Sequence, residues 1–368
     1  MATYKSRTKA THPETVTMRD VARLANVSQS TVSRILSPAS PKSKVRISDK
    51  TKEKVLKVVK DLGFHPNQYA RSLRGKKNFM IGMLIADISN PFYHPMVRAV
   101  QDVASQHHYS VMIANSDHLR EKEMLFCESV LRRPVDGAVI IPYHLTDDDL
   151  QNLITRTGMA ISVVGNHIRN PHVDVTFADD ARASYEATRW LIEQRGHKRI
   201  AIITANHEFP VVVRRYGAFR RAMADASLPV PDEYIVEGDW SVESGRRAIA
   251  SLLSLPKRPT AVFASSDTMA IGALETAVEL KFRVPEDIAI MGFDDIPAAS
   301  WVRPRLTTVA QFPGEMGTVM ARALFERIQG EYSGPARRHE VPYRFIERES
   351  TLTLPAQPGD AASEPAAS

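Results

Sequence analysis

The sequence predicts a small all-α head followed by a larger α/β body, in which two doubly wound parallel sheets form separate lobes. Three observations lead to this fold class. Residues 17–62 show helical apolar periodicity with a capping residue at each helix start. From residue 79 onward, short apolar segments alternate with amphipathic helices, which predicts parallel sheets with helices on both faces. The alternation lasts about 270 residues, too long for one small sheet.

Three short helices are expected in the head. Thr17 should cap the first, with Asp20 completing a capping-box-like start. Ser28 should cap the second, and the third should run from near Ser48 to Gly63. Only about three or four residues separate the first two helices, which is the spacing of a helix-turn-helix. The apolar positions expected to face the core of the head are Val21, Leu24 and Ala25, then Val32, Ile35 and Leu36, then Val55, Leu56, Val58, Val59 and Leu62.

The body should contain alternating strands and helices. Strands are expected over residues 80–86, 109–115, 136–142, 160–165, 199–205, 261–266 and 288–293. Helices are expected over residues 93–106, 121–133, 147–157, 182–196, 214–226, 242–255 and 267–280. Ligands of such sheets bind beyond the carboxyl ends of the strands, so we expect a binding site there.

Charge is distributed unevenly along the chain. The first 77 residues hold 18 Lys and Arg against 5 Asp and Glu, whereas the remainder holds 30 against 37. A disordered basic tail would explain the charge but not the helical periodicity and caps of residues 17–73. A basic head on an acidic body therefore indicates a nucleic-acid-binding unit attached to a body with another role.

Several classes of protein are not favoured. No apolar run approaches the ~18–20 residues of a membrane helix, and the basic N-terminal residues lack the apolar stretch of a secretory signal. We therefore expect a cytoplasmic protein without membrane contact. The single cysteine, Cys127, cannot form an internal disulfide and is expected to be a small buried hydrophobe. No dinucleotide, phosphate-loop, zinc-protease or nucleophile-elbow motif is present, so we expect no enzyme, cofactor or metal site.

One segment resembles a known family closely. TMRDVARLANVSQSTVSRIL, residues 17–36, resembles the helix-turn-helix of the LacI/GalR family of bacterial transcription regulators. The resemblance covers roughly residues 17–354 and implies a body of periplasmic-binding-protein type that holds an effector between its lobes. It also implies a homodimer that binds a pseudo-palindromic operator in double-stranded DNA. The further segments that carry the resemblance, in order, are FHPNQYARSLRGKK, IADISNPFY, DGAVI, IEQRGHKRIAII, FASSDTMAIGAL, EDIAIMGFDD, LTTV and FIERES.

The resemblance and the composition together suggest a division of the chain. We expect a disordered basic arm at 1–16, a helix-turn-helix domain at 17–66, a hinge helix or linker at 67–77, an effector-binding and dimerisation body at 78–354, and a disordered tail at 355–368. Crossovers between the lobes are expected near 165–177, 294–311 and 330–342. The loop 37–47 is about five residues longer than is usual in the family. Its Lys42, Lys44 and Arg46 could add phosphate contacts, or the loop could be a floppy insertion; both alternatives stay open.

The family resemblance assigns DNA-contacting roles in the head and hinge. Gln29 and Ser30 match the two base-reading positions, and Arg34 is expected to be a further base reader. The hinge resembles a segment that becomes helical only on the operator, where Leu73 would wedge into the minor groove. Ala70 would allow close backbone approach. The complete set of expected DNA-binding residues is Thr17, Ser28, Gln29, Ser30, Thr31, Ser33, Arg34, Asn67, Tyr69, Ala70, Arg71, Leu73 and Arg74.

The resemblance also implies an effector site in the body. Arg215 matches an arginine that grips effector oxygens, Trp240 an aromatic wall and Asp294 a cleft carboxylate. Aromatic walls with Arg and Asp suit a small sugar, polyol or sugar acid. Three departures leave fewer polar anchors for a simple hexose: Ser266 where many members carry Asn, an apolar loop at Phe209 and Val211–Val213, and Gly165 where some members carry Asp. The complete set of expected effector-binding residues is Phe92, Tyr93, Phe209, Arg215, Trp240, Ser266, Asp267, Asp294 and Gln311.

The sequence therefore predicts a homodimeric, effector-controlled regulator of transcription, most often repressing in this family. It does not give the sign of the effector's action. No leucine heptad follows FIERES, so we expect a dimer without an additional tetramerising helix. Two alternatives from other classes are a ligand-binding protein for transport and an enzyme with a nucleic-acid tether. The basic head argues against the first, and the missing catalytic motifs argue against the second.

Overall fold

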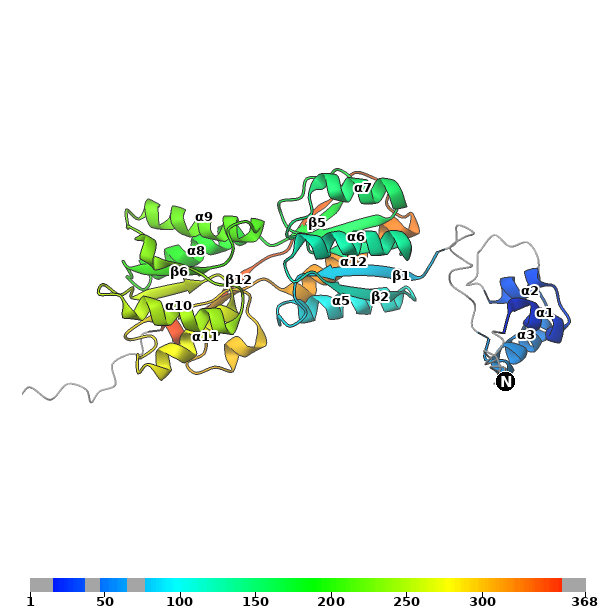
Figure 1. Ribbon diagram of the computed structural model, residues 1–368, viewed down its shortest axis with the longest axis horizontal. Coiled ribbons are helices and arrows are strands. Elements are labelled where there is room, and N and C mark those ends of the chain that lie inside the picture. The colour runs from blue at the N-terminus through cyan, green and yellow to red at the C-terminus, as the bar shows by residue number, and fades with distance from the viewer. Residues whose placement is uncertain (1–15, 37–46, 65–76, 353–368) are drawn as a thin grey trace, which may run out of the picture. The chain divides into compact units, whose positions relative to one another are not determined.

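The computed structural model describes residues 16–36, 47–64 and 77–352 (Figure 1). The chain divides into two compact units, Met1–Asn78 and Phe79–Ser368, which are here called the head and the body. Each unit is described by itself. Four expected features lie outside the described residues: the N-terminal arm, most of the basic loop, the hinge residues from Asn67 to Arg74, and the C-terminal tail.

The head contains three helices within the described residues, α1 (Met18–Ala25), α2 (Gln29–Ile35) and α3 (Asp49–Asp61). Thr17 and Asp20 form a reciprocal capping box at the start of α1. The side chain of Ser28 accepts a hydrogen bond from the backbone N–H of Thr31, and Ser48 caps α3 in the same way. The three predicted helix starts are therefore confirmed, and each is stabilised by a capping side chain.

The core of the head differs from the expected one at two leucines. Val21, Val32 and Val55 are fully buried, but Leu24 is 54% exposed and Leu56 is 43% exposed. The expectation for these two leucines was wrong. Successive residues of a helix are about 100° apart, so Leu56 lies well to one side of the face that Val55 directs inward. The three helices are too short to bury more than one narrow stripe each.

The body contains two parallel sheets within the described residues. The first lobe has the strand order β11-β5-β4-β3-β1-β2, and the second has the order β7-β6-β8-β9. The antiparallel pair β10 and β12 lies beside β9 through the bridges Met291–Thr307 and Asp294–Ala310. The strands are β1 (Met80–Ile85), β2 (Ser110–Asn115), β3 (Gly137–Ile140), β4 (Ala160–Val164), β5 (Asp174–Phe177), β6 (Ile200–Thr204), β7 (Ile235–Glu237), β8 (Ala261–Ala264), β9 (Ala289–Met291), β10 (Thr308–Ala310), β11 (Arg338–Glu340) and β12 (Arg344–Ile346).

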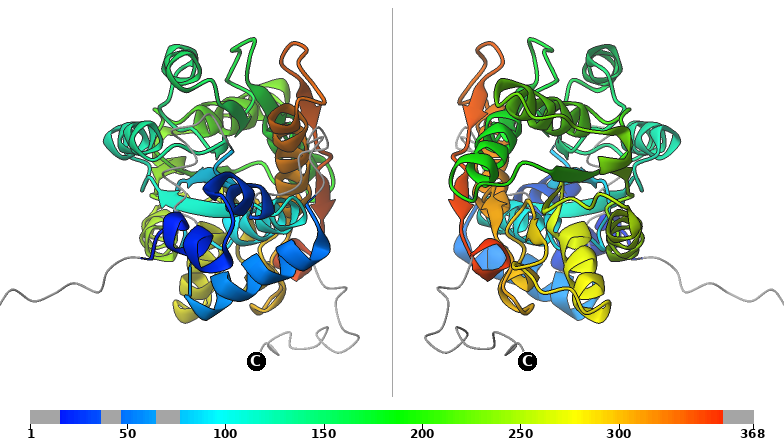
Figure 2. Two further views of the ribbon diagram at one scale, coloured as in Figure 1. Left: turned by 90° about the vertical axis from the view of Figure 1, so that its right-hand side faces the viewer. Right: turned by 90° about the vertical axis from the view of Figure 1, so that its left-hand side faces the viewer.

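Helices cover both faces of each sheet, as expected for doubly wound lobes. In the first lobe, α5 and α12 pack on one face and α6 and α7 on the other. In the second lobe, α8 and α9 lie on one side of β6 and α10 and α11 on the other (Figures 1 and 2). The helices of the body are α5 (Tyr93–Gln106), α6 (Arg120–Arg132), α7 (Asp147–Thr157), α8 (Asp180–Glu193), α9 (Pro210–Asp225), α10 (Val242–Ser254), α11 (Asp267–Glu279) and α12 (Pro313–Gln329), with short 3-10 turns at Asp232–Tyr234, Pro297–Ser300 and Glu349–Thr351.

Most predicted elements of the body are confirmed, but several were missed. The helix α12 was not predicted, although it packs Met320, Leu324 and Phe325 against the first sheet. The helix α9 begins at Pro210, four residues before its expected start. Val211–Val213 therefore belong to its first turn, and the expected apolar loop there was wrong. Proline is well suited to a first helical position, because its missing N–H would have no partner there in any case.

The chain passes between the lobes three times. It enters the second lobe between β5 and α8, returns between β10 and α12, and leaves the first lobe again between β11 and β12. These crossings lie at or just beyond the C-terminal ends of the expected ranges. Because β5 and β11 both pair within the first sheet, segments far apart in the sequence build each lobe.

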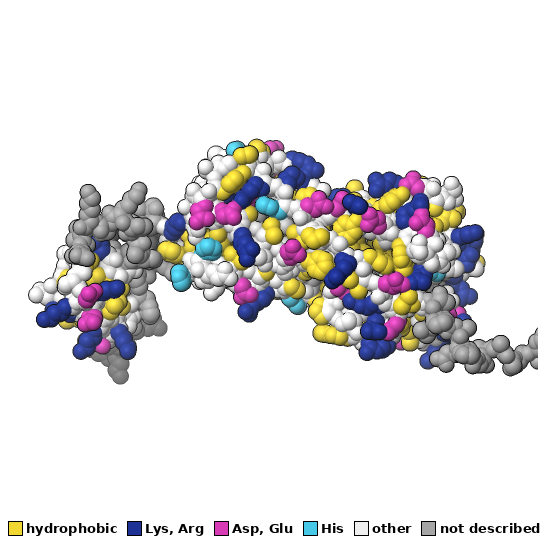
Figure 3. Space-filling model, turned by 180° about the vertical axis from the view of Figure 1, so that it is seen from behind, with side chains coloured by type: hydrophobic (Ala, Val, Ile, Leu, Met, Phe, Trp, Pro, Cys, Tyr) yellow, Lys and Arg dark blue, Asp and Glu magenta, His cyan; other side chains and the backbone are white. Residues whose placement is uncertain are grey.

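The surface of the body carries both signs of charge. Figure 3 shows a face on which Lys and Arg side chains are interspersed with Asp and Glu. Cys127 is buried on α6, as expected, and burial raises the pKa of its thiol to about 11. Across residues 16–36, 47–64 and 77–352, every helix is too short or too polar to cross a bilayer.

Candidate functional site

The exposed face of α2 carries the polar side chains expected to meet DNA. Gln29, Ser30 and Arg34 are exposed, whereas Thr31 and Ser33 are half-buried. No acidic residue lies in the first turn of α2. Donor and acceptor groups on short or flexible side chains thus share a surface free of carboxylates, and such a surface can approach base edges.

Ser28 and Thr17, two of the expected DNA-binding residues, hold the starts of helices within the head. The hydroxyl of Ser28 lies 3.2 Å from the backbone N of Thr31 and 2.7 Å from the hydroxyl of Ser30. The hydroxyl of Thr17 donates to Oδ2 of Asp20 at 2.6 Å. Both residues therefore fix helix starts, and any contact with DNA would be additional to that role. The expected hinge residues Asn67, Tyr69, Ala70, Arg71, Leu73 and Arg74 lie outside the described residues.

A cavity lies between the two lobes of the body. In the first lobe, its walls come from the segments that follow β1, β3, β4 and β5. In the second lobe, they come from the start of α9 and from residues that follow β7 and β9. This position, beyond the carboxyl ends of parallel strands, is where ligands of such sheets bind. Six of the expected effector-binding residues line the cavity: Phe92, Tyr93, Arg215, Trp240, Asp294 and Gln311.

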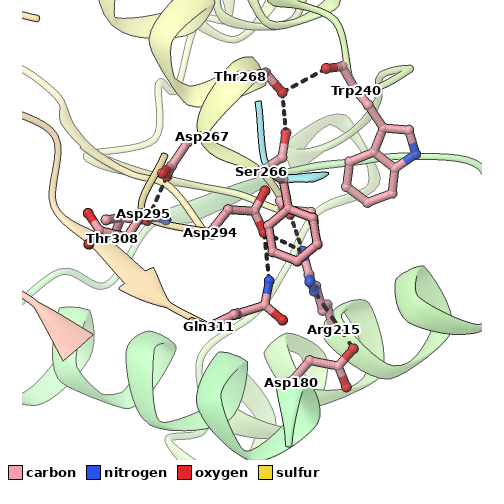
Figure 4. A network of polar contacts seen from close by, with 12 residues as sticks. Asp180, Arg215, Trp240, Ser266, Asp267, Thr268, Asp294, Asp295, Thr308 and Gln311 are labelled. Atoms are coloured by element: carbon pink, nitrogen blue, oxygen red, sulfur yellow. Dashed lines mark hydrogen bonds and ion pairs between the residues drawn. The ribbon is translucent and has the colours of Figure 1, made fainter. Parts of the chain in front are cut away.

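Arg215 is the buried centre of the polar network in this cavity (Figure 4). Its Nη1 donates to the backbone oxygen of Ser265 at 2.6 Å and lies 3.7 Å from Oδ1 of Asp294. Its Nε lies 3.9 Å from Oδ2 of Asp180. The guanidinium also stacks 3.9 Å from the centroid of the Phe293 ring. The ring and the two carboxyl groups fix the planar fork of Arg215 in one orientation.

Asp294 faces Arg215 from the other side of the network. Nε2 of Gln311 donates to Oδ1 of Asp294 at 2.7 Å. Burial raises the pKa of Asp294 to about 8, although Arg215 lowers it. Its φ of 123° lies in a region that non-glycine residues rarely adopt, at a typical cost of about 1–3 kcal/mol. Backbone strain and an unusual pKa at one residue are typical of a functional position.

Aromatic side chains form the remaining walls. The hydroxyls of Tyr93 and Tyr143 are 3.0 Å apart, and burial raises the pKa of both phenols. Trp240 contributes its ring, while its backbone oxygen accepts a hydrogen bond from Thr268 at 2.7 Å (Figure 4). Flat apolar walls beside an arginine and a carboxyl group can stack against a ring and bind its polar substituents.

Three expected effector-binding residues do not line this cavity. Asp267 is fully buried, where its carboxylate accepts from Thr308 Oγ1 at 2.6 Å and from the backbone N of Ile296 at 2.9 Å. Burial raises the pKa of Asp267 to about 7. Ser266 accepts from the backbone N of Met269 and thereby caps α11. Asp267 links α11 to β10 and to the segment after β9, and Ser266 caps α11, so the structure gives both residues a structural role.

Phe209 is the third of these residues, and it lies in a neighbouring groove. Its ring lies 5.0 Å from that of Tyr143 and 5.5 Å from that of His118, measured between centroids. The early start of α9 explains this position, because Phe209 is the N-cap of a helix whose next residues turn toward the cavity. Phe209 therefore packs the two lobes together beside the cavity.

The sequence did not single out several residues that line the cavity. Arg214 forms a bidentate ion pair with Asp180, with N–O distances of 2.8 and 2.9 Å. Tyr143, Asn166 and His167 also line the cavity. The adjacent arginines 214 and 215 were the only available signal, since Asp180 reads as an ordinary acid in the first turn of a helix. Within the described ranges, no three His, Cys, Asp or Glu residues gather as metal ligands would.

Two family descriptions match the chain. Residues 17–67 match "Bacterial regulatory proteins, lacI family", and residues 191–351 match "Periplasmic binding protein-like domain". Catabolite control protein A of Priestia megaterium is 34% identical over 337 residues, covering 91% of this chain and 99% of that protein. The HTH-type transcriptional repressor CytR of Escherichia coli K12 is 33% identical over 350 residues, covering 94% and 100%.

Solved structures agree with these relatives. The lac repressor dimer bound to operator and the anti-inducer ONPF matches with a TM-score of 0.78 at 26% identity, covering 92% of this chain and 100% of that chain. The transcriptional regulator CelR in complex with cellobiose matches with a TM-score of 0.66 at 28% identity, covering 91% of this chain and 99% of that chain. A LacI family regulator from Enterococcus faecium with bound ribose matches with a TM-score of 0.67 at 28% identity, covering 75% of this chain and 100% of that chain. With curated relatives above 30% identity over nearly its whole length, the chain belongs to the LacI family of bacterial regulatory proteins and is an effector-controlled, DNA-binding regulator of transcription.

Proposed function

We propose that this protein is a homodimeric repressor whose affinity for a pseudo-palindromic operator is set by a small polyhydroxylated effector. The effector would be a sugar, polyol or sugar acid bound in the cavity between the lobes, in the bacterial cytoplasm. One observation carries the proposal: a cavity at the carboxyl ends of both sheets has aromatic walls around Arg215 and Asp294, in a chain that also has a helix-turn-helix head.

The head would read the operator through α2. Gln29, Ser30 and Arg34 are exposed on one helix, which suits them to base edges in the major groove. Arg34 would recognise guanine, and Gln29 would recognise adenine or another base whose major-groove edge presents a similar pattern of donors and acceptors. Ser28, Thr31 and Ser33 would set the position of the helix against the phosphates. Leu73 of each subunit would wedge into the minor groove and kink the duplex between the half-sites.

The effector would bind through stacking and paired hydrogen bonds. Phe92, Tyr93 and Trp240 would contact the apolar face of a ring, and Arg215 would donate to its oxygens. The solved relatives with cellobiose and ribose support a carbohydrate-like ligand, because their ligands share this combination of a ring and many hydroxyls.

Coupling between the two sites would follow from the three crossings between the lobes. An effector that contacts both lobes favours the arrangement in which those contacts are best, and so shifts the population of body conformations. If only one arrangement holds the two heads at the spacing of the half-sites, effector affinity and operator affinity are coupled reciprocally. The family of the relatives favours this regulatory role over the transport role considered above.

The proposal is tested by selecting operators from a random duplex library with the full-length protein at physiological salt. The selection is repeated with D-ribose, cellobiose, myo-inositol and D-gluconate. We expect a palindromic site whose recovery changes with at least one of these ligands, and an Arg215→Lys variant that selects the same site without that response. Binding without sequence preference at physiological salt would contradict the proposal.

A further inference from the structure

Three side chains on the cavity wall have polar atoms that lack a hydrogen-bond partner among the described residues. These atoms are Nε of Arg215, Nε1 of Trp240 and both ring nitrogens of His167, and all four are shielded from solvent. Buried polar groups are normally hydrogen-bonded, since leaving one unpaired costs free energy. A group of unpaired atoms around one cavity therefore indicates that a ligand supplies the partners. Arg215 and Trp240 already belong to the proposed effector site, but His167 was not among the expected residues.

His167 reaches the cavity because of Gly165. The φ of Gly165 is +130°, a conformation that side chains rarely allow. A Cβ placed on Gly165 would lie 2.8 Å from Cε1 and 2.9 Å from Nδ1 of His167. The imidazole therefore occupies the space that any side chain at position 165 would need. The two residues form one unit, in which the missing side chain of Gly165 is replaced by the ring of His167.

The surroundings of His167 keep its ring neutral. Burial lowers the pKa of His167 to about 4; Arg214 and Arg169 lower it too, while Asp147 and Asp180 oppose this shift. A neutral imidazole has one N–H donor and one acceptor nitrogen. By contrast, the unpaired atoms of Arg215 and Trp240 can only donate. The acceptor nitrogen of His167 needs a partner that carries an O–H or N–H group, and a hydroxylated ligand in the cavity supplies one.

We propose that His167 determines specificity in the effector site by hydrogen bonding to ligand hydroxyl groups from the space that Gly165 leaves free. This inference rests on the proposed function and narrows it: the effector carries hydroxyls that both donate and accept, so a polyol or sugar fits and an acceptor-only anion does not. By the family resemblance, Gly165 stands where some members carry a cleft Asp, so one polar anchor is missing there. His167 supplies the replacement from two residues further along the chain.

The test measures binding to the full-length protein by titration calorimetry. The ligands are D-ribose, cellobiose, myo-inositol and D-gluconate, with sulfate, which carries no O–H at neutral pH, as an acceptor-only comparison. His167→Leu removes both nitrogens, whereas His167→Asn keeps one donor and one acceptor. His172→Ala is the matched control, because His172 is exposed in the same connection between β4 and β5. We expect His167→Leu to weaken the tightest hydroxylated ligand about tenfold, the loss of one to two neutral hydrogen bonds. We expect His167→Asn to recover part of that loss and His172→Ala to bind as the wild type does.

Position 165 supplies an independent test. Gly165→Ala should displace the ring and weaken the same ligand about tenfold. In a His167→Ala background, where no large side chain is left to displace, Gly165→Ala should weaken the ligand only by the backbone strain that it adds in both backgrounds, and the difference between the two losses identifies the pair as a unit. The ligand-free His167→Leu protein should melt no lower than the wild type, because the substitution removes two unpaired nitrogens.

The possible outcomes separate this inference from the proposed function. If a hydroxylated ligand binds the wild type and His167→Leu equally well, His167 does not determine specificity, although the proposed function stands. Equal losses from Gly165→Ala in both backgrounds would likewise overturn the pairing of the two residues. If sulfate binds more tightly than every hydroxylated ligand, or none of the ligands binds the wild type, the proposed effector class fails and this inference fails with it.

Discussion

The Asp294→Asn substitution probes the buried charge at the centre of the cavity. Burial raises the pKa of Asp294 to about 8, against an ordinary value of 3.8. The folded body therefore holds a proton there that the unfolded chain releases above about pH 4. Below about pH 4 the carboxyl is protonated in both states, and its burial costs no charge. As pH rises from 4 toward 8, ionisation favours the unfolded chain, and the free energy of unfolding falls. At about 1.4 kcal/mol per pH unit, the loss between pH 5 and pH 8 is at most about 4 kcal/mol.

Asparagine keeps the oxygen that accepts from Gln311 and has no charge to bury. The free energy of unfolding of Asp294→Asn minus that of the wild type should therefore increase steadily from pH 5 to pH 8. Urea unfolding followed by tryptophan fluorescence measures this, since Trp190, Trp240 and Trp301 all lie in the body. Glu286→Gln, an exposed carboxyl in the same lobe, is the control. If this difference in free energy of unfolding does not change with pH, or decreases, Asp294 is an ionised partner of Arg215.

Three further substitutions test the head and the first lobe. Ser28→Ala removes the cap of α2 and should lower the free energy of unfolding of the head by about 1 kcal/mol. Thermal unfolding followed by far-UV circular dichroism should show a lower melting temperature for the head, and an unchanged one would contradict the capping role. Gln29→Ala should change base preference at particular operator positions in a binding selection, and a uniform loss across all sequences would refute base reading. Asp174 is fully buried, and its partners Arg327 and Arg337 are 13% and 21% exposed. Asp174→Asn breaks both ion pairs, whose N–O distances are 2.7 and 2.9 Å, and should lower the free energy of unfolding in urea by about 3 kcal/mol. A loss in free energy of unfolding below 1 kcal/mol would show that water molecules take over the hydrogen bonds that the Asp174 carboxylate makes to the two arginines.

Periodicity and capping explain why most of the fold could be predicted. Thr17, Ser28 and Ser48 each stand three residues before the backbone N–H that they accept from, so the helix starts of the head are local properties. The exposure of Leu24 and Leu56 is not local, because it depends on which narrow stripe of each short helix meets the other two. The strand β5 pairs on one side with β11, more than a hundred residues later, so its place depends on contacts between distant segments.

The polar network of the cavity could be predicted only in part. Arg215 and Asp294 match positions that the family resemblance identifies, Gln311 follows the motif LTTV, and the structure brings the three together. Asp267 lies within the motif FASSDTMAIGAL, but its side chain points into the junction of β9 and β10, which periodicity cannot distinguish from the cavity. His167 enters the cavity because a glycine two residues earlier adopts a positive φ, and no spacing rule predicts that conformation. Backbone geometry, rather than residue type, decided these cases.

Ligand in the cavity and operator at the head are expected to bind with coupled affinities. This coupling is measured as the affinity of the wild-type protein for its selected operator by fluorescence anisotropy, with and without a saturating ligand from the panel. The affinity of that ligand is then measured with and without the operator. We expect a change of about 5–150-fold in operator affinity and the same factor in ligand affinity. The ligand should lose this effect in Arg215→Lys. A ligand that binds in the cavity while operator affinity stays unchanged would show that the two sites are not coupled.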